Sequence, residues 1–319
     1  MRVLVAGGAG FVGSHLCRAL IDGGHEVACV DDLSSGRITN VSDLMTHEGF
    51  KFYEADVTRR RWDYGTLPEP PDVVVHLASP ASPVDYDRRP LATLAANSFG
   101  TDNLLRIALN ARARFIYAST SEVYGDPLVH PQPESYFGNV DPVGPRSCYD
   151  EGKRFGEALV TVFRQEFGTQ AAIMRIFNTY GPSMRLDDGR VIPAFLSAAL
   201  SGRPMPVHGD GRQTRSYMYV ADLVAALLHV AMDQNLDGLV ANVGNPEEST
   251  VIDLAWRVLA ITGRNELGVE YLPARPGDPR QRRPDITRMR ERYGWSPTVT
   301  LSEGLLKTVA WARSQEEGQ

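Results

Sequence analysis

Hydrophobic and polar positions at the start of the chain alternate between short apolar runs and a helical pattern. Residues 3–5 are apolar and lead into a glycine-rich turn, after which apolar residues recur at helical spacing between Val12 and Leu20. A glycine pair ends that pattern, and a second apolar run at residues 26–30 ends in Asp31. The order therefore predicts a strand, a glycine turn, a helix, a second strand and an acid.

The same alternation continues through the first half of the chain. Further strands are predicted at residues 50–57, 73–78, 115–119 and 171–177, with helices chiefly at 91–111 and 149–167. Alternating strands and helices predict an α/β fold, with a parallel sheet covered on both faces and with sites at the carboxyl ends of its strands. The two long helices are rich in alanine and leucine, and pack either on the sheet or on a second subunit.

The composition of the sequence and the length of its predicted elements change after Asn178. Glycine–proline pairs such as Gly181-Pro182 break the chain into shorter elements, and arginine becomes frequent. Arginine grips phosphates and carboxylates with two hydrogen bonds, so this region is a candidate anion-binding lobe. The alternative is a solvated surface with ordinary ion pairs.

Composition limits the class of protein. The chain has 319 residues, 43% of them hydrophobic, and a net charge of −6, a balance that disfavours nucleic acid as a partner. Three cysteines, without framework spacing or a histidine cluster, argue against both disulfides and a metal site. No apolar run approaches the length of a membrane span and no signal segment is recognisable, so we expect a cytoplasmic protein without membrane association.

The first turn has the features of a dinucleotide site. Its glycines, Gly7, Gly10 and Gly13, let backbone N–H groups approach a pyrophosphate at the positive end of a helix. Asp31 follows 18 residues after Gly13, where an acid binds a ribose 2′-hydroxyl and repels a 2′-phosphate. The spacing therefore predicts that the turn binds NAD rather than NADP. The alternative is a glycine turn that binds no ligand. Asp56, at the end of a later strand, either meets the adenine or caps its own turn.

A tyrosine and a lysine form the candidate base. Tyr149 precedes Lys153 by four residues, so both lie on one face of a helix. An ammonium beside a phenol favours the phenolate, and Thr120 upstream is placed to hold the oxygen that the tyrosine deprotonates. Together the three predict a general base, a group that tunes its pKa and a group that orients the substrate.

With these residues in place, the chain resembles the extended short-chain dehydrogenase/reductase family over nearly its whole length. The resemblance is carried by residues 77–83, 119–127, 144–154, 175–182, 188–191, 213–215 and 278–285. Two departures are Phe137, where the family often has tryptophan, and Ser216-Tyr217, where it often has alanine and phenylalanine.

The resemblance implies a Rossmann-type doubly wound parallel sheet with a smaller mixed C-terminal substrate lobe. It implies an NAD-binding domain at residues 1–178, to which parts of 208–246 return, and a nucleotide-sugar-binding lobe at 179–207 and 247–319. The implied activity is the redox-neutral, NAD-dependent decarboxylation of UDP-glucuronate to UDP-xylose and CO2 through a UDP-4-keto sugar, in a homodimer formed through the two long helices. Alternatives are a nucleotide-sugar 4-epimerase, a 4,6-dehydratase and a non-catalytic NAD-sensing regulator.

The predicted site residues fall into three groups. The catalytic group is Thr120, Ser121, Glu122, Tyr149, Lys153 and Arg215. The predicted NAD contacts are Gly7, Gly10, Phe11, Val12, Gly13, Asp31, Asp32, Asp56, Val57, Leu77, Ala78, Ser79, Asn97, Ser119, Tyr149 and Lys153. The predicted substrate contacts are Pro83, Tyr86, Glu122, Asn178, Arg185, Val191, Arg215, Tyr217 and Arg282.

Several of these roles follow from the resemblance alone. It implies that Glu122 and Arg215 act near C5 and C6 of the sugar, and that Asn178, Arg185, Val191, Arg215 and Arg282 contact the diphosphate. Related dehydratases carry aspartate at the position of Ser121, where it protonates a leaving hydroxyl, and serine is too weak an acid for that step. The alternatives are that Glu122 is a strand-end carboxylate paired with an arginine, that Asn178 caps a turn and that Tyr86 only packs.

Overall fold

A seven-stranded parallel sheet forms the centre of the larger part of the molecule. The computed structural model describes residues 1–59, 69–274 and 280–317. Its strands are β1 (Arg2–Ala6), β2 (Glu26–Asp31), β3 (Phe50–Glu54), β4 (Val73–His76), β5 (Arg114–Thr120), β6 (Ala171–Ile176) and β11 (Val240–Val243), in the order β11-β6-β5-β4-β1-β2-β3. The order reverses between β1 and β4, so a crevice opens there at the carboxyl ends of the strands.

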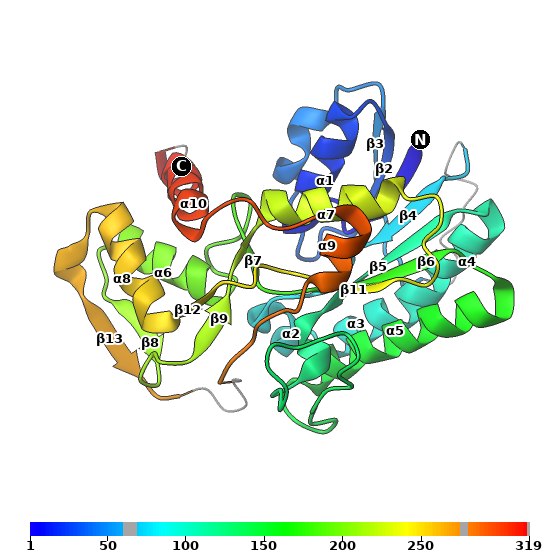
Figure 1. Cartoon of the computed structure of the whole chain (residues 1–319). Coiled ribbons are helices and arrows are strands. Elements are labelled where there is room, and N and C mark those ends of the chain that lie inside the picture. Colours follow the sequence, from blue (N-terminus) through cyan, green and yellow to red (C-terminus); the bar gives the residue numbers. More distant parts are fainter. Residues whose placement is uncertain (60–68, 275–279, 318–319) are drawn as a thin grey trace.

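Helices cover both faces of this sheet, as the alternating sequence pattern predicts (Figure 1). One face carries α1 (Phe11–Asp22) and α7 (Val220–Met232), and the other carries α3 (Pro90–Ala95), α4 (Thr101–Ala111) and α5 (Ser147–Phe167). Strand side chains alternate between the two faces, so Val3 and Val5 join one hydrophobic core and Leu4 joins the other. The Rossmann-type fold is thereby confirmed.

The helix predicted at residues 91–111 is interrupted. Between α3 and α4 the backbone makes one π-helical turn, η4 (Ala96–Gly100), which contains the buried Asn97. The Asn97 side chain donates to the Thr93 carbonyl and to the Ser79 hydroxyl, and it accepts from the Tyr117 hydroxyl. A hydrophobic period does not reveal such a turn, since the apolar face continues through it.

Strands end earlier than the sequence predicts. The strands predicted at 50–57 and 73–78 end at Glu54 and His76, so Asp56 and Ala78 lie in the loops beyond. The loops still belong to the carboxyl edge of the sheet, where side chains face the crevice. The short helix α2 (Pro83–Arg88) follows at the same edge, and the 3₁₀ turns η1 (Ile38–Asn40), η2 (Ser42–Leu44) and η5 (Ser121–Tyr124) lie in connecting segments.

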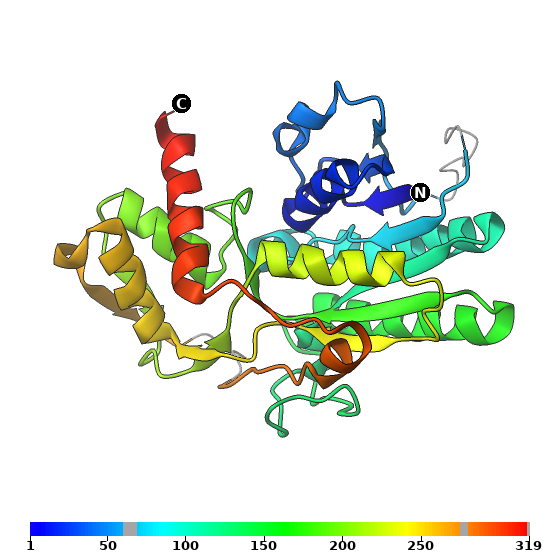
Figure 2. The ribbon, with the colours of Figure 1, turned by 45° about the horizontal axis from the view of Figure 1, so that its top comes forward.

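A smaller group of elements stands at the other end of the molecule. It contains α6 (Val191–Leu200), β8 (Met205–His208), α8 (Val251–Thr262), η6 (Asn265–Leu267), β13 (Val269–Leu272) and α10 (Leu301–Glu317). Figure 2 shows α10 standing against α8 and α6, away from the main sheet. Strands β8 and β13 pair in parallel.

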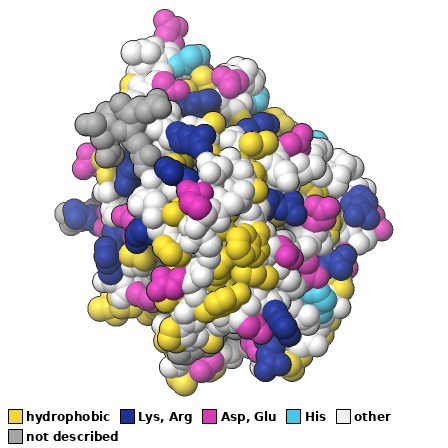
Figure 3. All heavy atoms as spheres, turned by 90° about the vertical axis from the view of Figure 1, so that its left-hand side faces the viewer, with side chains coloured by type: hydrophobic (Ala, Val, Ile, Leu, Met, Phe, Trp, Pro, Cys, Tyr) yellow, Lys and Arg dark blue, Asp and Glu magenta, His cyan; other side chains and the backbone are white. Residues whose placement is uncertain are grey.

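Short elements connect the two groups. The pairs β7 (Thr179–Tyr180) with β10 (Met218–Tyr219), and β9 (Thr214–Ser216) with β12 (Glu248–Thr250), lie between them. Helix α9 (Thr287–Tyr293) belongs by sequence to the second group but packs against β11 of the main sheet. On the face at the end of the second group, basic and acidic side chains are interspersed around hydrophobic ones (Figure 3).

Candidate active site

One cleft of about 870 Å³ collects the predicted residues from both parts of the chain. It lies at the carboxyl ends of the strands and is closed on the other side by residues between Asn178 and Arg190, together with Arg215, Tyr217 and Arg282. Every predicted catalytic and substrate residue lines it, and so does every predicted NAD contact except Asn97. Such a cleft is large enough for a sizeable organic ligand.

The glycine turn packs closely against neighbouring backbone at the edge of the cleft. Gly7 has a φ of +81°, and a Cβ there would lie 2.7 Å from the backbone nitrogen of Ala78. A Cβ on Gly13 would lie 2.1 Å from the Gly7 carbonyl oxygen, so only glycine fits either position. Helix α1 begins immediately after Gly10, whose cap position has no side-chain hydrogen bond, and Phe11 lines the cleft. The first N–H groups of α1 therefore face the cleft and suit a pyrophosphate.

Asp31 has two roles at the tip of β2. Its carboxylate accepts hydrogen bonds from the backbone nitrogens of Ala9 at 3.0 Å and Leu33 at 2.9 Å. Burial raises its pKa, and these hydrogen bonds partly oppose that rise. Asp31 therefore fixes the glycine turn and also presents an acid to the cleft, which suits a free ribose 2′-hydroxyl. Asp56 bonds the backbone and hydroxyl of Thr58, as a turn cap does, while also lining the cleft.

Tyr149 and Lys153 lie together beneath the cleft. Lys153 Nζ is 6.0 Å from the centre of the Tyr149 ring and donates to the Ala118 carbonyl at 2.8 Å. Tyr149 stacks on Tyr86, with ring centres 5.1 Å apart and planes inclined by 15°. Tyr86 therefore packs directly on the candidate base, in addition to lining the cleft.

Burial dominates the electrostatics of this pair. Burial raises the pKa of Tyr149 to about 12, although a hydrogen bond with Thr120 opposes the rise. Burial likewise lowers the pKa of Lys153 to about 7, against the charge of Glu157, which raises it. Burial therefore has the larger effect on the pKa of Tyr149, and the predicted tuning of that pKa by Lys153 stays a prediction. Further positive charge is needed before Tyr149 becomes a base at neutral pH.

Glu122 is held by arginines from distant parts of the chain. Its carboxylate lies 2.5 Å from Arg146 Nη2, and Arg282 donates to both of its oxygens, with Nη2 at 3.0 Å from Oε2. Burial would raise the pKa of Glu122, but the charges of Arg282, Arg146 and Arg215 outweigh it and lower the pKa. Arg282 binds this carboxylate and is 3% exposed, and its predicted contact with a diphosphate stays a prediction.

Glu122 is thus paired with arginines, as one of the two interpretations of the sequence expected. The catalytic role of Glu122 stays a prediction. The neighbouring Asp150 has a pKa raised to about 7, because its carboxyl is buried and faces the charge of Glu122. Arg215 donates to the Thr214 carbonyl at 2.8 Å and is 8% exposed. Three guanidinium groups therefore surround one fully ionised carboxylate, an environment that favours an additional anion.

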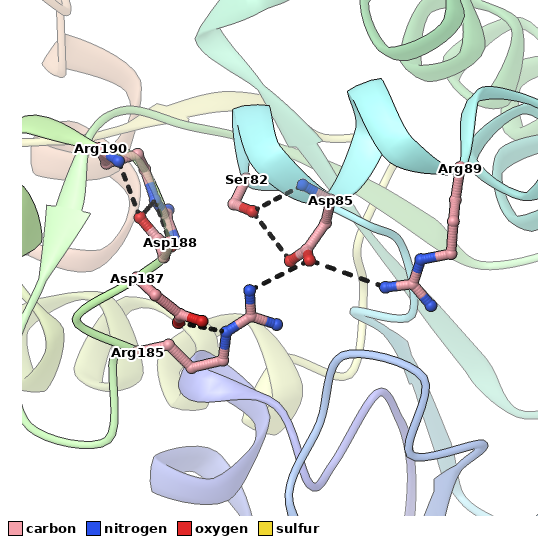
Figure 4. A network of polar contacts seen from close by, with 7 residues as sticks. All are labelled: Ser82, Asp85, Arg89, Arg185, Asp187, Asp188 and Arg190. Atoms are coloured by element: carbon pink, nitrogen blue, oxygen red, sulfur yellow. Dashed lines mark hydrogen bonds and ion pairs between the residues drawn. The ribbon is translucent and has the colours of Figure 1, made fainter.

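A second ion-pair network crosses the cleft and is shown in Figure 4. Ser82 caps α2 by accepting from the Asp85 backbone nitrogen at 3.1 Å, and its hydroxyl donates to the Asp85 carboxylate at 2.8 Å. The same carboxylate accepts from Arg185 Nη2 at 3.1 Å and pairs with Arg89 at 3.7 Å. Arg185 also donates to Asp187 at 3.1 Å. The network therefore connects α2 with the loop before α6.

Arg190 sits at the end of the same loop. It donates from its backbone nitrogen and its guanidinium to Asp188, which is 4% exposed. Both residues line the cleft, and the charge of Arg190 also lowers the pKa of Tyr149 against the larger effect of burial. Neither residue was predicted as a site residue.

Known proteins resemble this chain in sequence and in fold over nearly its whole length. Residues 3–244 match the model of the NAD dependent epimerase/dehydratase family. The chain belongs to this family. Its glycine turn, its acid on β2 and its tyrosine–lysine pair lie within the matched residues.

Curated relatives of this family member share one name. UDP-glucuronic acid decarboxylase 1 of Danio rerio is 44% identical over 318 residues, covering 100% of this chain and 74% of the relative. UDP-glucuronic acid decarboxylase 3 of Arabidopsis thaliana is 45% identical over 306 residues, covering 96% of this chain and 87% of the relative.

Solved structures of the family include enzymes with other reactions. UDP-glucose 4-epimerase of Thermotoga maritima, with UDP-glucose, is 33% identical with a TM-score of 0.88, covering 99% of this chain and 100% of that one. UDP-glucuronic acid 4-epimerase of Bacillus cereus, in complex with UDP-glucuronic acid and NAD, is 29% identical with a TM-score of 0.89 and the same coverage. The fold is therefore shared with 4-epimerases.

The cleft is also lined by side chains that were not among the predicted site residues. These are Asp85, Arg146, Asp188 and Arg190, all lining the cleft. A weak signal exists for Asp85, because Ser82-Pro83-Val84-Asp85 has the pattern of a helix cap with an acid three residues on. Nothing local in the sequence distinguishes Arg146 from the other arginines.

Two further observations concern the described part of the chain. Within it, no group of three histidine, cysteine, aspartate or glutamate side chains is arranged to hold a metal ion. In the same residues, none of the helices combines the length and the apolar character required to cross a bilayer.

Proposed function

We propose that this member of the NAD dependent epimerase/dehydratase family converts UDP-glucuronate to UDP-xylose and CO2. One observation carries the proposal: a dinucleotide turn, a tyrosine–lysine base and an arginine-rich pocket around Glu122 line a single cleft. The near-full-length similarity to curated UDP-glucuronic acid decarboxylases supports the same reaction.

We propose that the glycine turn, the N-terminus of α1 and Asp31 hold NAD. The fit is supported by the N–H groups at the start of α1 and by the position of Gly7, Gly10 and Gly13 on the wall of the cleft. When bound, NAD⁺ supplies the reversible oxidation of the sugar at C4, so that the net reaction needs no external oxidant. Lys153 is the residue proposed to hold the nicotinamide ribose.

Tyr149 Oη accepts the proton of the C4 hydroxyl, and Thr120 holds the same oxygen by a hydrogen bond. Because the pKa of Tyr149 is raised to about 12, this step depends on positive charge from Lys153 and from the bound cofactor. The resulting 4-keto sugar with a carboxylate on C5 is a β-keto acid. It loses CO2 readily because the electrons left at C5 delocalise into the C4 carbonyl, whose oxygen Thr120 and Tyr149 stabilise.

The pocket around Glu122 suits the uronate end of the sugar. Arg146, Arg215 and Arg282 provide more positive charge than Glu122 neutralises, so an incoming carboxylate is attracted. The proton that C5 takes up after loss of CO2 comes from water, because Glu122 is ionised and an arginine keeps its protons. We propose that Glu122 and Arg215 orient this water, and that Arg282 holds Glu122 in position. Ser121 is too weak an acid to expel a C6 hydroxyl, which disfavours a 4,6-dehydratase.

The remaining substrate contacts are proposed on their position in the cleft. Asn178, Arg185 and Val191 lie on the wall contributed by the loop before α6, where we expect the diphosphate. Tyr217 is proposed to meet the uracil, and Pro83 with Tyr86 to line the sugar pocket.

We propose a homodimer built on α3, η4 and α5. These elements pack against one another on the outer side of the sheet. They expose a group of large apolar side chains, Leu91, Leu94, Phe99, Phe155, Val162 and Phe167. A second copy of this surface would cover them.

We also propose the two-domain division given by the sequence, with α9 returning to the main sheet, and a reducing, cytoplasmic location. The three cysteines form no disulfide in the structure. Their number and spacing do not fit a disulfide framework, which suits a reducing compartment.

The decisive experiment incubates the purified protein with UDP-glucuronate and no added oxidant, followed by mass spectrometry of the sugar nucleotide. Loss of the mass of CO2 without accumulation of NADH is the expected result. An unchanged mass with a shifted retention time would instead identify a 4-epimerase, the activity of the Bacillus cereus neighbour. No conversion at all would contradict the proposed substrate.

A further inference from the structure

A buried carboxylate lies one helical turn beyond Lys153. Glu157 follows Lys153 by four residues on α5, so the two side chains share a face of the helix. Ser119 Oγ donates to Glu157 Oε1 at 2.5 Å, and Arg175 donates from Nε to Oε1 at 2.9 Å and from Nη2 to Oε2 at 2.7 Å. Residues from β5 and β6 thus hold this carboxylate in one place through charge-assisted hydrogen bonds.

The amine of Lys153 is equally confined. It is 3% exposed and donates to the carbonyl of Ala118, the residue before Ser119 on β5. Strand β5 therefore binds the lysine through one residue and the glutamate through the next. Adjacent contacts on one strand fix the two charged groups relative to each other.

The other titratable groups near Lys153 carry no negative charge at neutral pH. The Tyr117 ring of β5 is centred 5.1 Å from Lys153 Nζ, and the Tyr149 ring of α5 is centred 6.0 Å away. His76 of β4 is fully buried and its pKa is lowered to about 3, by burial first and then by the charge of Lys153. Burial lowers the pKa of Lys153. In contrast to these three groups, the charge of Glu157 raises that pKa.

We propose that Glu157 is a positioning residue whose clamped carboxylate keeps the Lys153 amine charged at the pH at which Tyr149 works. This inference deepens the proposed function, since it rests on Lys153 acting beside Tyr149. A neutral lysine would neither favour the phenolate nor hold a ribose by charge-assisted hydrogen bonds. Arg175 acts through Glu157, because its two hydrogen bonds fix the orientation of the carboxylate.

The composition of the chain allows a direct measurement. It contains three lysines, Lys51, Lys153 and Lys307, so the full-length protein labelled with ¹³Cε-lysine gives three titrating signals. The signal lost in Lys153→Met belongs to Lys153. In the unsubstituted protein we expect it to titrate at lower pH than the other two.

Glu157→Gln keeps the shape of the side chain and removes its charge. We expect this change to lower the Lys153 titration midpoint by about one pH unit. Glu157→Asp retains a carboxylate set back by one methylene, and its midpoint should lie between those of the unsubstituted protein and Glu157→Gln. Glu166→Gln, the same substitution at an exposed position of α5, should leave the midpoint unchanged.

An unchanged midpoint in Glu157→Gln would overturn the inference and leave Glu157 as a tie between α5 and the sheet. Equal midpoints in Glu157→Asp and Glu157→Gln would overturn it too, because charge would then have no effect. Should Glu157→Gln not fold, Glu157→Asp decides: a lowered midpoint supports the inference and an unchanged one overturns it. The titration needs neither sugar nucleotide nor NAD, so its outcome is independent of the product assay.

Discussion

The carboxylate of Glu122 lies 2.5 Å from the guanidinium of Arg146, and this contact joins the end of β5 to the start of α5. Arg282, 160 residues further along the chain, binds the same carboxylate from the other side. The strand that carries Thr120, the helix that carries Tyr149 and the C-terminal segment therefore meet at one side chain. The position of Glu122 depends on all three.

Glu122→Gln should slow the reaction more than it weakens nucleotide binding. It leaves the side-chain shape but removes the charge that Arg146 and Arg282 bind, so we expect kcat to fall by about 10²-fold. Steady-state kinetics and calorimetry with UDP separate the two effects, and a thermal melt checks the fold. Glu166→Gln is the matched control on exposed surface. A higher KM with kcat unchanged would contradict a role in the chemistry.

Tyr149→Phe removes the proposed base and should lower kcat by about 10³-fold, with nucleotide binding preserved. Stacking on Tyr86 is retained in the variant, because the ring stays in place. The measurement is the rate of UDP-glucuronate consumption beside the affinity for UDP. Tyr271→Phe, at a side chain that is 61% exposed, should behave like the unsubstituted protein. Turnover that survives in Tyr149→Phe would rule out this residue as the base.

Asp31→Ala should weaken NAD binding by more than about tenfold and reduce discrimination against NADP. A charged hydrogen bond to the ribose is lost, while repulsion of a 2′-phosphate disappears. Calorimetry with both dinucleotides measures the two affinities. Because Asp31 also holds the backbone of Ala9 and Leu33, the melting temperature should fall as well. Asp43→Ala is the control. An equal loss of affinity for both dinucleotides would mean that Asp31 has only a structural role.

Acid should destabilise the fold through His76. Its pKa is lowered to about 3 by burial and by the charge of Lys153, whereas in the unfolded chain it is near 6.5. Below pH 6.5 His76 is protonated in the unfolded chain but stays neutral in the folded protein. The free energy of unfolding therefore decreases as the pH falls. Between pH 7 and pH 5 this amounts to about 2 kcal/mol. Urea unfolding should show a smaller acid loss for His76→Gln, and parallel pH curves would exclude His76 as the cause.

Introducing charged side chains on the outer face of η4 and α5 should dissociate the proposed dimer. Phe99 is 58% exposed and Phe155 is 53% exposed on elements that pack against each other. Phe99→Glu combined with Phe155→Glu should give a monomer in sedimentation, because burying two carboxylates at an apolar interface is costly. Leu306→Glu on α10 is the control at an exposed apolar position. A monomeric unsubstituted protein, or a dimer that survives both substitutions, would contradict this surface.

The local features of the site were predictable because each is encoded within a few residues. A glycine turn between an apolar run and a helical pattern, an acid at the next strand end and a tyrosine one turn before a lysine are all short-range relations. The parallel sheet followed from alternating strands and helices in the same way. The single π turn at residues 96–100 was not predicted, because the apolar period continues through it.

Contacts between distant residues were decided only by the tertiary structure. The sequence identified many arginines but could not say that Arg146 and Arg282 bind Glu122, or that Arg185 binds Asp85 across the cleft. It also predicted that Lys153 tunes the pKa of Tyr149, but it did not reveal that burial raises this pKa to about 12. Charge pairing and desolvation depend on which surfaces the folded chain brings together, and a sequence of residue types does not contain those distances. The sequence by itself determined the kinds of chemistry available, and the tertiary structure decided their partners and their charges.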